Sequence, residues 1–227
     1  MKKYILSIAL IFFLTLDINA HVEHYSKYNY LEYELFRNNK SIGYHTYKFQ
    51  RKGEDLIINN EVSFKITKLG VNLYKYSAQG VEKYKNGKFS GFNSKTNQNK
   101  KEKYVKITVD PTDENLVIDG SSFKGKVNKD MIIGTWWNHE IVSKKAQISA
   151  VSGRIIEQKV EFKGKEDIKI GEKVYKTLRF NFSSSDPSLS KDKKLNTDIW
   201  YEEDTFLWVK AAFDKTGYWE YRLKKVK

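Results

Sequence analysis

The sequence predicts an all-β protein with a minor helical segment, built as one strongly curved antiparallel sheet that forms a half-barrel or a barrel. Three observations lead to this fold class. Aromatic and β-branched residues recur in short runs that alternate with polar residues, which is the period of a half-buried strand. The gaps between runs are too short for the crossover helices that parallel strands need. The 227 residues contain only 2 prolines and no linker that would split the strands between domains.

The first half of the chain is predicted to be a series of hairpins. Its expected strands cover residues 28–36, 42–49, 56–66, 71–78, 81–85, 103–110 and 116–119. Residues 56–66 alternate cleanly, and only Asn60 breaks their apolar face. Asn86-Gly87 predicts a tight hairpin turn, because both residues accept the positive φ angles of a type I′ turn.

The second half begins with a segment that does not alternate. Residues 130–145 therefore predict a short helix or a bulky loop that covers one side of the sheet, with Asp130 or Asn128 as its N-cap. Strands are then expected at residues 147–151, 155–163, 166–170, 174–183, 197–201, 207–213 and 218–223. Residues 183–194 are polar and rich in Ser, Asp and Lys, and we expect a surface loop there.

Residues 1–20 have the pattern of a cleavable signal peptide. Lys2 and Lys3 precede an apolar run over residues 5–16, and a polar stretch then ends at Ala20. The apolar run is too short for a stable membrane anchor, so the cut is expected after Ala20. The sequence thus predicts a single β-rich domain over residues 21–227, periplasmic or secreted, with no transmembrane segment in the mature chain. Because the chain has no Cys, its stability must come from a core and not from disulfides.

The charge of the chain is strongly positive, at +13. Lys supplies most of it, because Arg is scarce. Arg is preferred for bidentate phosphate recognition, and its scarcity argues against a nucleic-acid partner. The charge is suited to an anionic envelope surface, although it bears equally on solubility.

Two strand pairs carry a family resemblance. They are the Tyr-rich opening strand, which leads through Lys40-Ser41-Ile42-Gly43-Tyr44 into its partner, and the closing hairpin with Ile199-Trp200-Tyr201 and Leu207-Trp208-Val209-Lys210. Together they resemble exported bacterial families of unknown function, DUF6134-like and similar to DUF3108-like proteins. The resemblance covers most of the mature chain. It implies a periplasmic half-barrel, similar to that of lipoprotein carriers, and it implies no activity or functional residues.

Histidine is the first residue type to weigh for chemistry. After a cut at Ala20, His21 would be the N-terminus and could chelate copper through its amine and imidazole, with His24, His45 or His139 completing a nitrogen site. His139 precedes Glu140, as a general base beside a carboxylate would, but neighbouring residues do not face each other on a helix or strand.

No nucleophile elbow, zinc motif or phosphate loop occurs. The sequence therefore favours a protein that is not an enzyme, and no cofactor is expected.

The tryptophans are the most informative side chains. We single out five as candidate ligand-binding residues: Trp136, Trp137, Trp200, Trp208 and Trp219. Most aromatic side chains belong to a core, but two adjacent tryptophans are hard to bury together on one element. One of the pair is therefore expected at a cavity or its mouth. A curved sheet lined by such rings could hold an apolar ligand. The same rings beside Lys could instead stack on a sugar or lie at a membrane interface.

Three functions therefore remain open, in this order. The first is a binding or carrier domain for a lipid-like or other apolar ligand in the envelope. The second is a structural or interaction protein that contacts anionic lipid or polysaccharide. The third is a copper-binding or hydrolytic enzyme built on His21 or His139. Alternation alone does not separate a filled core from an open cavity, because both give the same pattern.

Overall fold

The computed structural model describes residues 25–190 and 193–227, so the expected signal peptide, Ala20 and His21 lie outside the described residues. Fifteen strands form a single sheet, which confirms the all-β class. The strands are β1 (Tyr30–Arg37), β2 (Lys40–Lys52), β3 (Asp55–Lys68), β4 (Val71–Lys85), β5 (Lys88–Gln98), β6 (Lys101–Val109), β7 (Leu116–Gly120), β8 (Lys124–Val127), β9 (Ile132–Ile133), β10 (Ala146–Ile148), β11 (Ile155–Ile170), β12 (Lys173–Ser184), β13 (Asn196–Glu202), β14 (Trp208–Asp214) and β15 (Tyr218–Val226).

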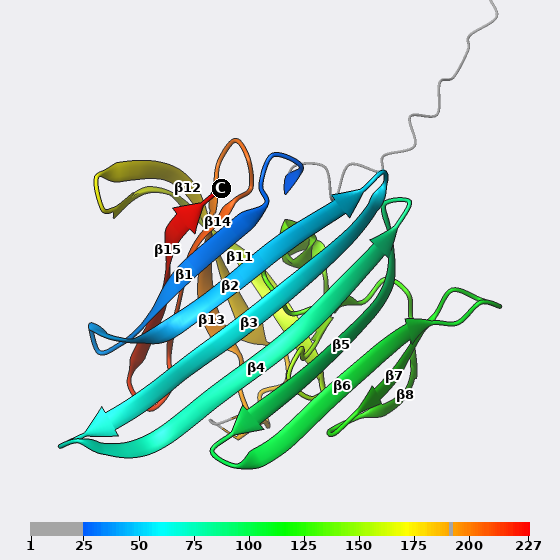
Figure 1. The fold of residues 1–227 in the computed structure, drawn as a ribbon, viewed down its shortest axis with the longest axis horizontal. Helices are drawn as coiled ribbons and strands as arrows, with labels where there is room; N and C mark the ends of the chain where they lie inside the picture. The colour runs from blue at the N-terminus through cyan, green and yellow to red at the C-terminus, as the bar shows by residue number, and fades with distance from the viewer. Residues whose placement is uncertain (1–24, 191–192) are drawn as a thin grey trace, which may run out of the picture.

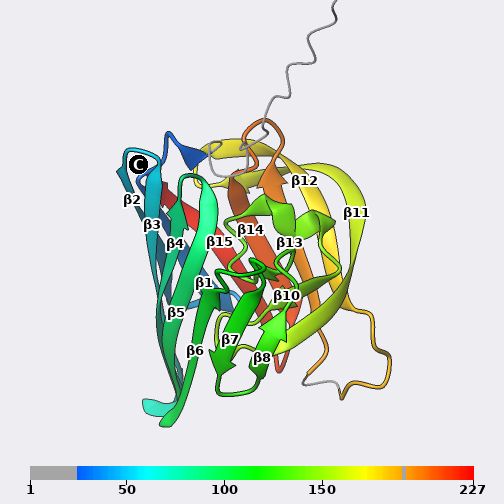
Figure 2. The ribbon, with the colours of Figure 1, turned by 90° about the vertical axis from the view of Figure 1, so that its right-hand side faces the viewer.

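The strands follow one another in the sheet almost as they do in the chain. The spatial order is β8-β7-β6-β5-β4-β3-β2-β1-β15-β14-β13-β12-β11-β10-β9, in which β1 and β15 join the two halves. Every pairing is antiparallel except that of β9 with β10. The sheet curls into an open barrel (Figures 1 and 2), and β8 and β9 remain as its two edges. Within the described residues, no helix has the length and apolar character needed to cross a bilayer.

Strand β4 is continuous, although residues 71–78 and 81–85 were expected as separate strands. The interruption is Gly80, which lies directly opposite Asn60 of β3. A Cβ atom at Gly80 would lie 2.8 Å from Asn60 Oδ1, so the glycine makes room for the amide. Asn60 and Gly80, which each break the apolar pattern of their own strand, therefore form one cross-strand pair. The missing side chain of Gly80 leaves the space that the Asn60 amide occupies.

The segment that does not alternate forms part of the interior of the barrel. Residues 131–153, here called the interior segment, contain β9, a short 3-10 helix η2 (His139–Ser143) and β10. The expected short helix is present, but its N-cap is Asn138 and not Asp130 or Asn128. Asn138 Oδ1 accepts the backbone N–H of Glu140 at 3.0 Å, as a cap residue does. Trp137 and Ile141 of this segment are fully buried among side chains of the sheet.

Candidate functional site

The middle of the barrel is filled, and a buried carboxylate fixes the filling in place. Glu82 on β4 accepts hydrogen bonds from the Tyr84 hydroxyl at 2.6 Å and from Trp137 Nε1 at 3.0 Å. Thr135 Oγ1 donates to the same carboxylate at 3.4 Å. Burial raises the pKa of Glu82 above its usual value, while these donors oppose that rise. The interior segment is thus held to the sheet by a satisfied polar cluster as well as by apolar packing.

Tyrosine hydroxyls bind the backbone of the interior segment from the opposite walls. Tyr201 on β13 donates to the Trp136 carbonyl at 2.9 Å, and Tyr47 on β2 donates to the Thr135 carbonyl. Trp136 has a φ of +62°, which is uncommon for a bulky residue. The hydrogen bonds on both sides of that residue hold its backbone in this conformation.

A layer of aromatic rings packed in tilted and edge-on contacts lies next to this filling. His45 on β2 is buried between the rings of Tyr33, Tyr47, Trp208 and Tyr221. Burial lowers the pKa of His45 to about 3, so its imidazole is neutral near pH 7. The Nδ1 atom of His45 and the Nε1 atom of Trp208 have no hydrogen-bond partner among the described residues.

Beyond the ring layer the barrel opens into an aromatic pocket of about 580 Å³. It lies between the ends of β3, β4 and β5 on one side and the β14–β15 hairpin with the end of β1 on the other. The lining residues are Arg37, Phe64, Ile66, Leu73, Tyr74, Tyr76, Gln98, Phe213, Lys215, Thr216, Trp219 and Tyr221. Burial raises the pKa of Tyr76 to about 12, so its hydroxyl stays protonated and neutral near pH 7. We call this cavity the end pocket.

A glycine allows the two walls of the end pocket to meet. Gly43 of β2 lies between Phe64 of β3 and Leu35 of β1 in the sheet. A Cβ atom at Gly43 would lie 2.0 Å from the Ser63 carbonyl oxygen and 2.6 Å from Phe64 Cβ. Because Gly43 has no side chain, the Phe64 ring lies over that strand and makes an edge contact with Trp219 at 5.2 Å.

Parallel rings line both walls of the pocket. Phe64 stacks on Tyr76 at 4.8 Å on one wall, and Phe213 stacks on Trp219 at 5.9 Å on the other. These rings are half-buried, so each has one part packed and another part facing the pocket. Such a surface suits an apolar ligand of extended shape.

One cation at the pocket wall lacks a carboxylate partner. Arg37 places its guanidinium 5.9 Å from the centre of the Trp219 ring and donates to the Thr216 carbonyl. Its Nε atom is buried and has no hydrogen-bond partner in the described part of the chain. None of the ion pairs between described residues includes Arg37. A guanidinium in this state is ready to bind an anionic group.

Another hollow of the described molecule has a different lining. A surface depression of about 860 Å³ lies between β10, β11 and β12, and most of its lining residues are charged or polar, such as Lys144, Glu157 and Gln158. Apolar rings are concentrated at the end pocket. We therefore take the end pocket as the candidate functional site.

The structure places the five candidate tryptophans in different environments. Trp219 lines the end pocket. Trp137 and Trp208 are fully buried, and Trp136 packs against the same core. Trp200 is buried at a separate site on β13, where the Arg179 guanidinium lies 5.1 Å and the Lys210 ammonium 4.9 Å from its ring.

The five tryptophans therefore do not form one site. The expectation that one of the adjacent pair lies at a cavity mouth has no counterpart at the end pocket, whose lining includes neither Trp136 nor Trp137. Sequence reasoning did not single out Phe64, Tyr74, Tyr76, Phe213 or Arg37. The only sequence signal for these residues was the alternation of aromatic residues at the ends of two strand pairs. Strands that line a filled core show the same alternation, so the signal does not identify a pocket.

The two histidines that the structure describes lie in different surroundings. His139 lies on η2 and stacks on Phe206 at 4.4 Å, while His45 lies in the ring layer. His21 and His24 lie outside the described residues. Within residues 25–190 and 193–227, no group of three or more His, Asp or Glu side chains is placed to hold a metal ion.

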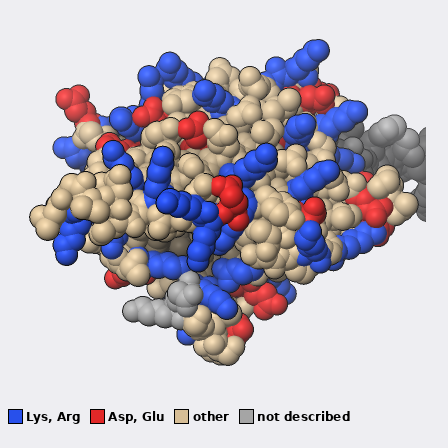
Figure 3. Space-filling view, turned by 60° about the horizontal axis from the view of Figure 1, so that its bottom comes forward, with Lys and Arg blue, Asp and Glu red and all other residues tan. Residues whose placement is uncertain are grey.

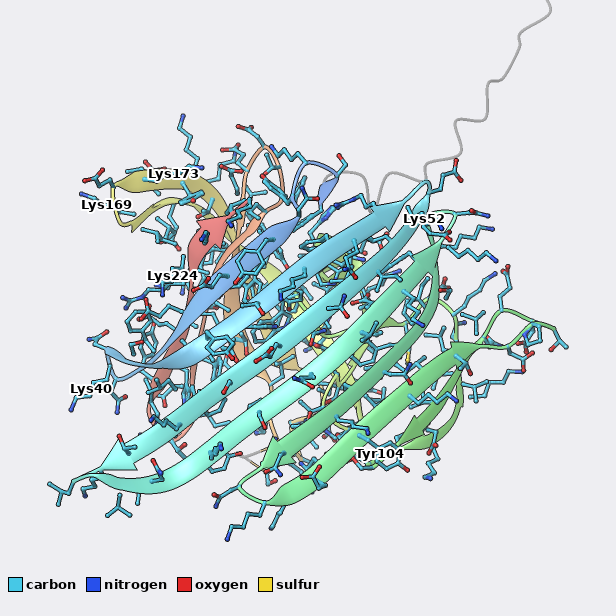
Figure 4. The ribbon with its side chains drawn as sticks, viewed as in Figure 1. Lys40, Lys52, Tyr104, Lys169, Lys173 and Lys224 are labelled. Carbon is cyan, nitrogen blue, oxygen red and sulfur yellow. The ribbon has the colours of Figure 1, made fainter. Side chains whose placement is uncertain are left out.

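Positive charge is distributed over the whole surface. Lys169 and Lys173 lie together on the β11–β12 hairpin, whereas Lys40 and Lys52 lie at opposite ends of β2 (Figure 4). Figure 3 turns the pocket end of the barrel toward the viewer and shows many Lys and Arg side chains around a hollow in this face. The charge alone therefore does not mark a site, whereas its combination with the end pocket does.

Comparison with known proteins supports the fold and leaves the activity open. A crystal structure of a "Beta-barrel-like Protein of Domain of Unknown Function DUF1849 from Brucella abortus" superposes with a TM-score of 0.59 at 12% identity, covering 87% of this chain and 96% of that chain. At this identity the similarity shows the fold alone. No curated protein matches the sequence. The model of the family described as "Domain of unknown function (DUF6134)" matches residues 33–224, and the chain belongs to that family.

Proposed function

We propose that this protein is a binding or carrier domain for a lipid-like ligand in the cell envelope, with the end pocket as its binding site. The observation that carries the proposal is the end pocket itself. Facing walls of stacked aromatic rings enclose about 580 Å³, and an arginine without a carboxylate partner lies at the edge of one wall. A pocket of this size that is mostly apolar and has few convergent polar groups is typical of small-molecule sites.

The pocket chemistry suggests an amphiphile with one anionic end. An acyl chain would replace water along Phe64, Tyr76 and Trp219, and burial of each CH₂ group contributes about 0.8 kcal/mol. A carboxylate or phosphate would pair with the guanidinium of Arg37, which lacks a carboxylate partner among the described residues. A fatty acid or a lysophospholipid satisfies both requirements.

The barrel interior also supports a pocket at one end instead of a tunnel. The interior segment and the ring layer fill the middle of the barrel, so a ligand would enter and leave at the pocket end. The sequence also predicted a half-barrel like that of lipoprotein carriers, and such a fold would suit the binding and release of a ligand at one end. Location in the periplasm or outside the cell belongs to the same proposal, because it depends on residues 1–20.

Two measurements test the proposal. Native mass spectrometry of the exported chain should detect co-purified lipid. A fatty acid with a nitroxide on its chain should quench the fluorescence of Trp219. A Trp219→Phe variant keeps an aromatic wall and should lose most of the quenching, whereas Trp200→Phe, with its ring between Arg179 and Lys210, should keep it.

The anionic end of the ligand is tested separately. Arg37→Gln should weaken binding of the fatty acid about tenfold, because a hydrogen bond to a charged group is worth about 1.5–3 kcal/mol. Arg154→Gln is the matched control, since Arg154 lies outside the pocket lining. If neither lipid nor quenching is detected, or if the quenching survives in Trp219→Phe, the end pocket is not the site.

A second function remains a candidate because of the surface charge. An interaction protein that contacts anionic lipid or polysaccharide would use the Lys side chains around the pocket end (Figure 3). Its binding would fall steeply with salt and would not need the pocket. A salt-sensitive interaction that persists in Trp219→Phe and Arg37→Gln, found together with no co-purified lipid and no nitroxide quenching, would favour it.

A further inference from the structure

The hairpin of β3 and β4 extends beyond its neighbours at the pocket end. The pairing of β2 with β3 ends at Gly43 and Phe64, and that of β4 with β5 ends at Tyr76 and Gln98. Residues 65–75 therefore form a two-stranded projection with no third strand, here called the hairpin tip. Figure 1 shows the projection reaching past the β1–β2 and β5–β6 turns along the direction of the strands.

The hairpin tip exposes large apolar side chains. Leu69 is 95% exposed, Val71 62% and Leu73 53%, and the three lie within five consecutive residues. Leu73 also lines the end pocket. Single exposed apolar residues are ordinary, but a cluster on a projecting tip that no described residue of the chain covers indicates an interaction surface.

The turn places a leucine where the backbone disfavours it. Leu69 and Gly70 both have positive φ, at +49° and +78°. Four other hairpin turns have two such residues in a row. Three of them begin with Asn, at Asn38, Asn86 and Asn99, as expected for a residue that tolerates this conformation, and the fourth begins with Thr216. Leu69 thus costs conformational energy, and its side chain gains almost no packing against the described residues. A residue whose backbone conformation is unfavourable and whose side chain makes no compensating contact is expected where function requires it.

Lysines surround the apolar tip, and no acid lies near it in the sequence. Lys65, Lys68 and Lys75 are exposed, and no Asp or Glu occurs between Glu61 and Glu82. Apolar side chains inside a ring of ammonium groups match the boundary of an anionic bilayer. There the apolar groups enter the acyl region and the cations meet the phosphates. A polysaccharide would match the charge but would leave the apolar side chains uncovered.

We propose that the hairpin tip docks on an anionic lipid bilayer by inserting Leu69, Val71 and Leu73 at its surface. Docking depends on the tip alone. Because Leu73 belongs to both the tip and the pocket wall, docking would bring the mouth of the end pocket to the lipid, and this second step rests on the proposed function. The protein would then take an amphiphile from the membrane on which it docks, or deliver an amphiphile to that membrane.

Vesicle co-sedimentation of the exported chain tests the docking. Binding is expected to vesicles of phosphatidylcholine mixed with phosphatidylglycerol, and much weaker binding to phosphatidylcholine alone. Leu69→Asn should weaken the binding about tenfold, since it removes one buried leucine, and should leave the melting temperature equal or higher because Asn accepts positive φ. Val174→Asn is the matched control, because Val174 is 53% exposed beside Lys173 on the distant β11–β12 hairpin (Figure 4).

The absence of Cys in the sequence allows a direct measurement of insertion. A Leu69→Cys variant labelled with an environment-sensitive fluorophore should show a blue shift on anionic vesicles, and a labelled Val174→Cys variant should not. Arg37→Gln should dock as the unmodified protein does, so loss of pocket binding and loss of docking can be told apart. The proposal is overturned by binding to neither vesicle type, by equal binding of Leu69→Asn, or by equal shifts at both labelled positions.

Discussion

The middle of the barrel and its pocket end are built from the same kinds of residue and differ in what covers them. Around Trp137 the rings are covered by the interior segment, and the polar atoms of Glu82 are satisfied by Tyr84, Trp137 and Thr135. Around Trp219 the rings are half-buried and Arg37 lacks a carboxylate partner among the described residues. Aromatic alternation therefore builds a core where a segment of the chain fills the space, and a pocket where no described segment fills it.

The largest effect should come from the filled region. Trp137→Ala removes a fully buried indole and the donor to Glu82, and should lower the free energy of unfolding by about 3–5 kcal/mol. Trp219→Ala should lower it by less, because the Trp219 ring is only partly buried. Urea denaturation of both variants measures the difference. Equal losses would mean that the two regions are packed alike and that the contrast between core and pocket is wrong.

The next effect is the loss of stability at low pH that His45 causes. His45 belongs to the ring layer between the filled middle of the barrel and the end pocket. The unfolded chain binds a proton at His45 near pH 6.5, whereas the buried imidazole has its pKa lowered to about 3. The stabilising contribution of the neutral His45 is therefore present above about pH 6.5 and is lost as the pH falls toward 3. His45→Gln should flatten the fall of the unfolding free energy over this range, as measured by denaturation at several pH values.

Glu82→Gln provides a control of opposite sign. Because burial raises the pKa of Glu82, the folded chain binds its proton at higher pH than the unfolded chain does. The contribution of Glu82 to the free energy of unfolding is present below the pKa that Glu82 has in the unfolded chain. It is lost as the pH rises through the higher pKa that Glu82 has in the folded chain. Removing this carboxyl should therefore steepen the loss of stability in acid, whereas removing His45 should reduce it. The same direction of change in both variants would contradict the assigned protonation states.

A smaller effect is expected at the glycine that joins the pocket walls. Gly43→Ala would place Cβ against the Ser63 carbonyl oxygen and Phe64, and should destabilise the fold by about 1–3 kcal/mol. It should also displace Phe64 from Trp219 and weaken ligand binding. Gly91→Ala on β5 is a milder control, since its Cβ would meet only the Ile107 carbonyl oxygen, at 3.2 Å. If Gly43→Ala were as stable as the unmodified chain, the close approach of β2 and β3 would not be needed to build the pocket.

The sequence predicts the strands that alternate and misses those that do not. Strand β5 was not expected, because its buried positions include Ser94 and Thr96 beside Phe92, and small polar residues give no apolar period. The pairing of Asn60 with Gly80 could not be found either, since each residue looks like an interruption until the strands are placed side by side.

The candidate site was less predictable than the fold. Trp219 was singled out by residue type, but Phe64 and Arg37 join it only because Gly43 and the sheet order bring three distant strands together. Whether the rings enclose a core or a pocket depends on the path of residues 131–153, and that path leaves no period in the sequence.

The smallest effect tests how firmly the interior segment is held. Tyr201→Phe removes the hydroxyl that donates to the Trp136 carbonyl at 2.9 Å and keeps the ring, so the free energy of unfolding should fall by about 1 kcal/mol. The freed carbonyl belongs to a residue held at positive φ, and the segment near Trp136 should therefore open more often. Hydrogen exchange at residues 135–138 should speed up while exchange in β3 and β4 stays unchanged. Faster exchange throughout the sheet would show that the segment and the barrel unfold as one unit, and that the filling is part of the fold and not a separable feature of the middle of the barrel.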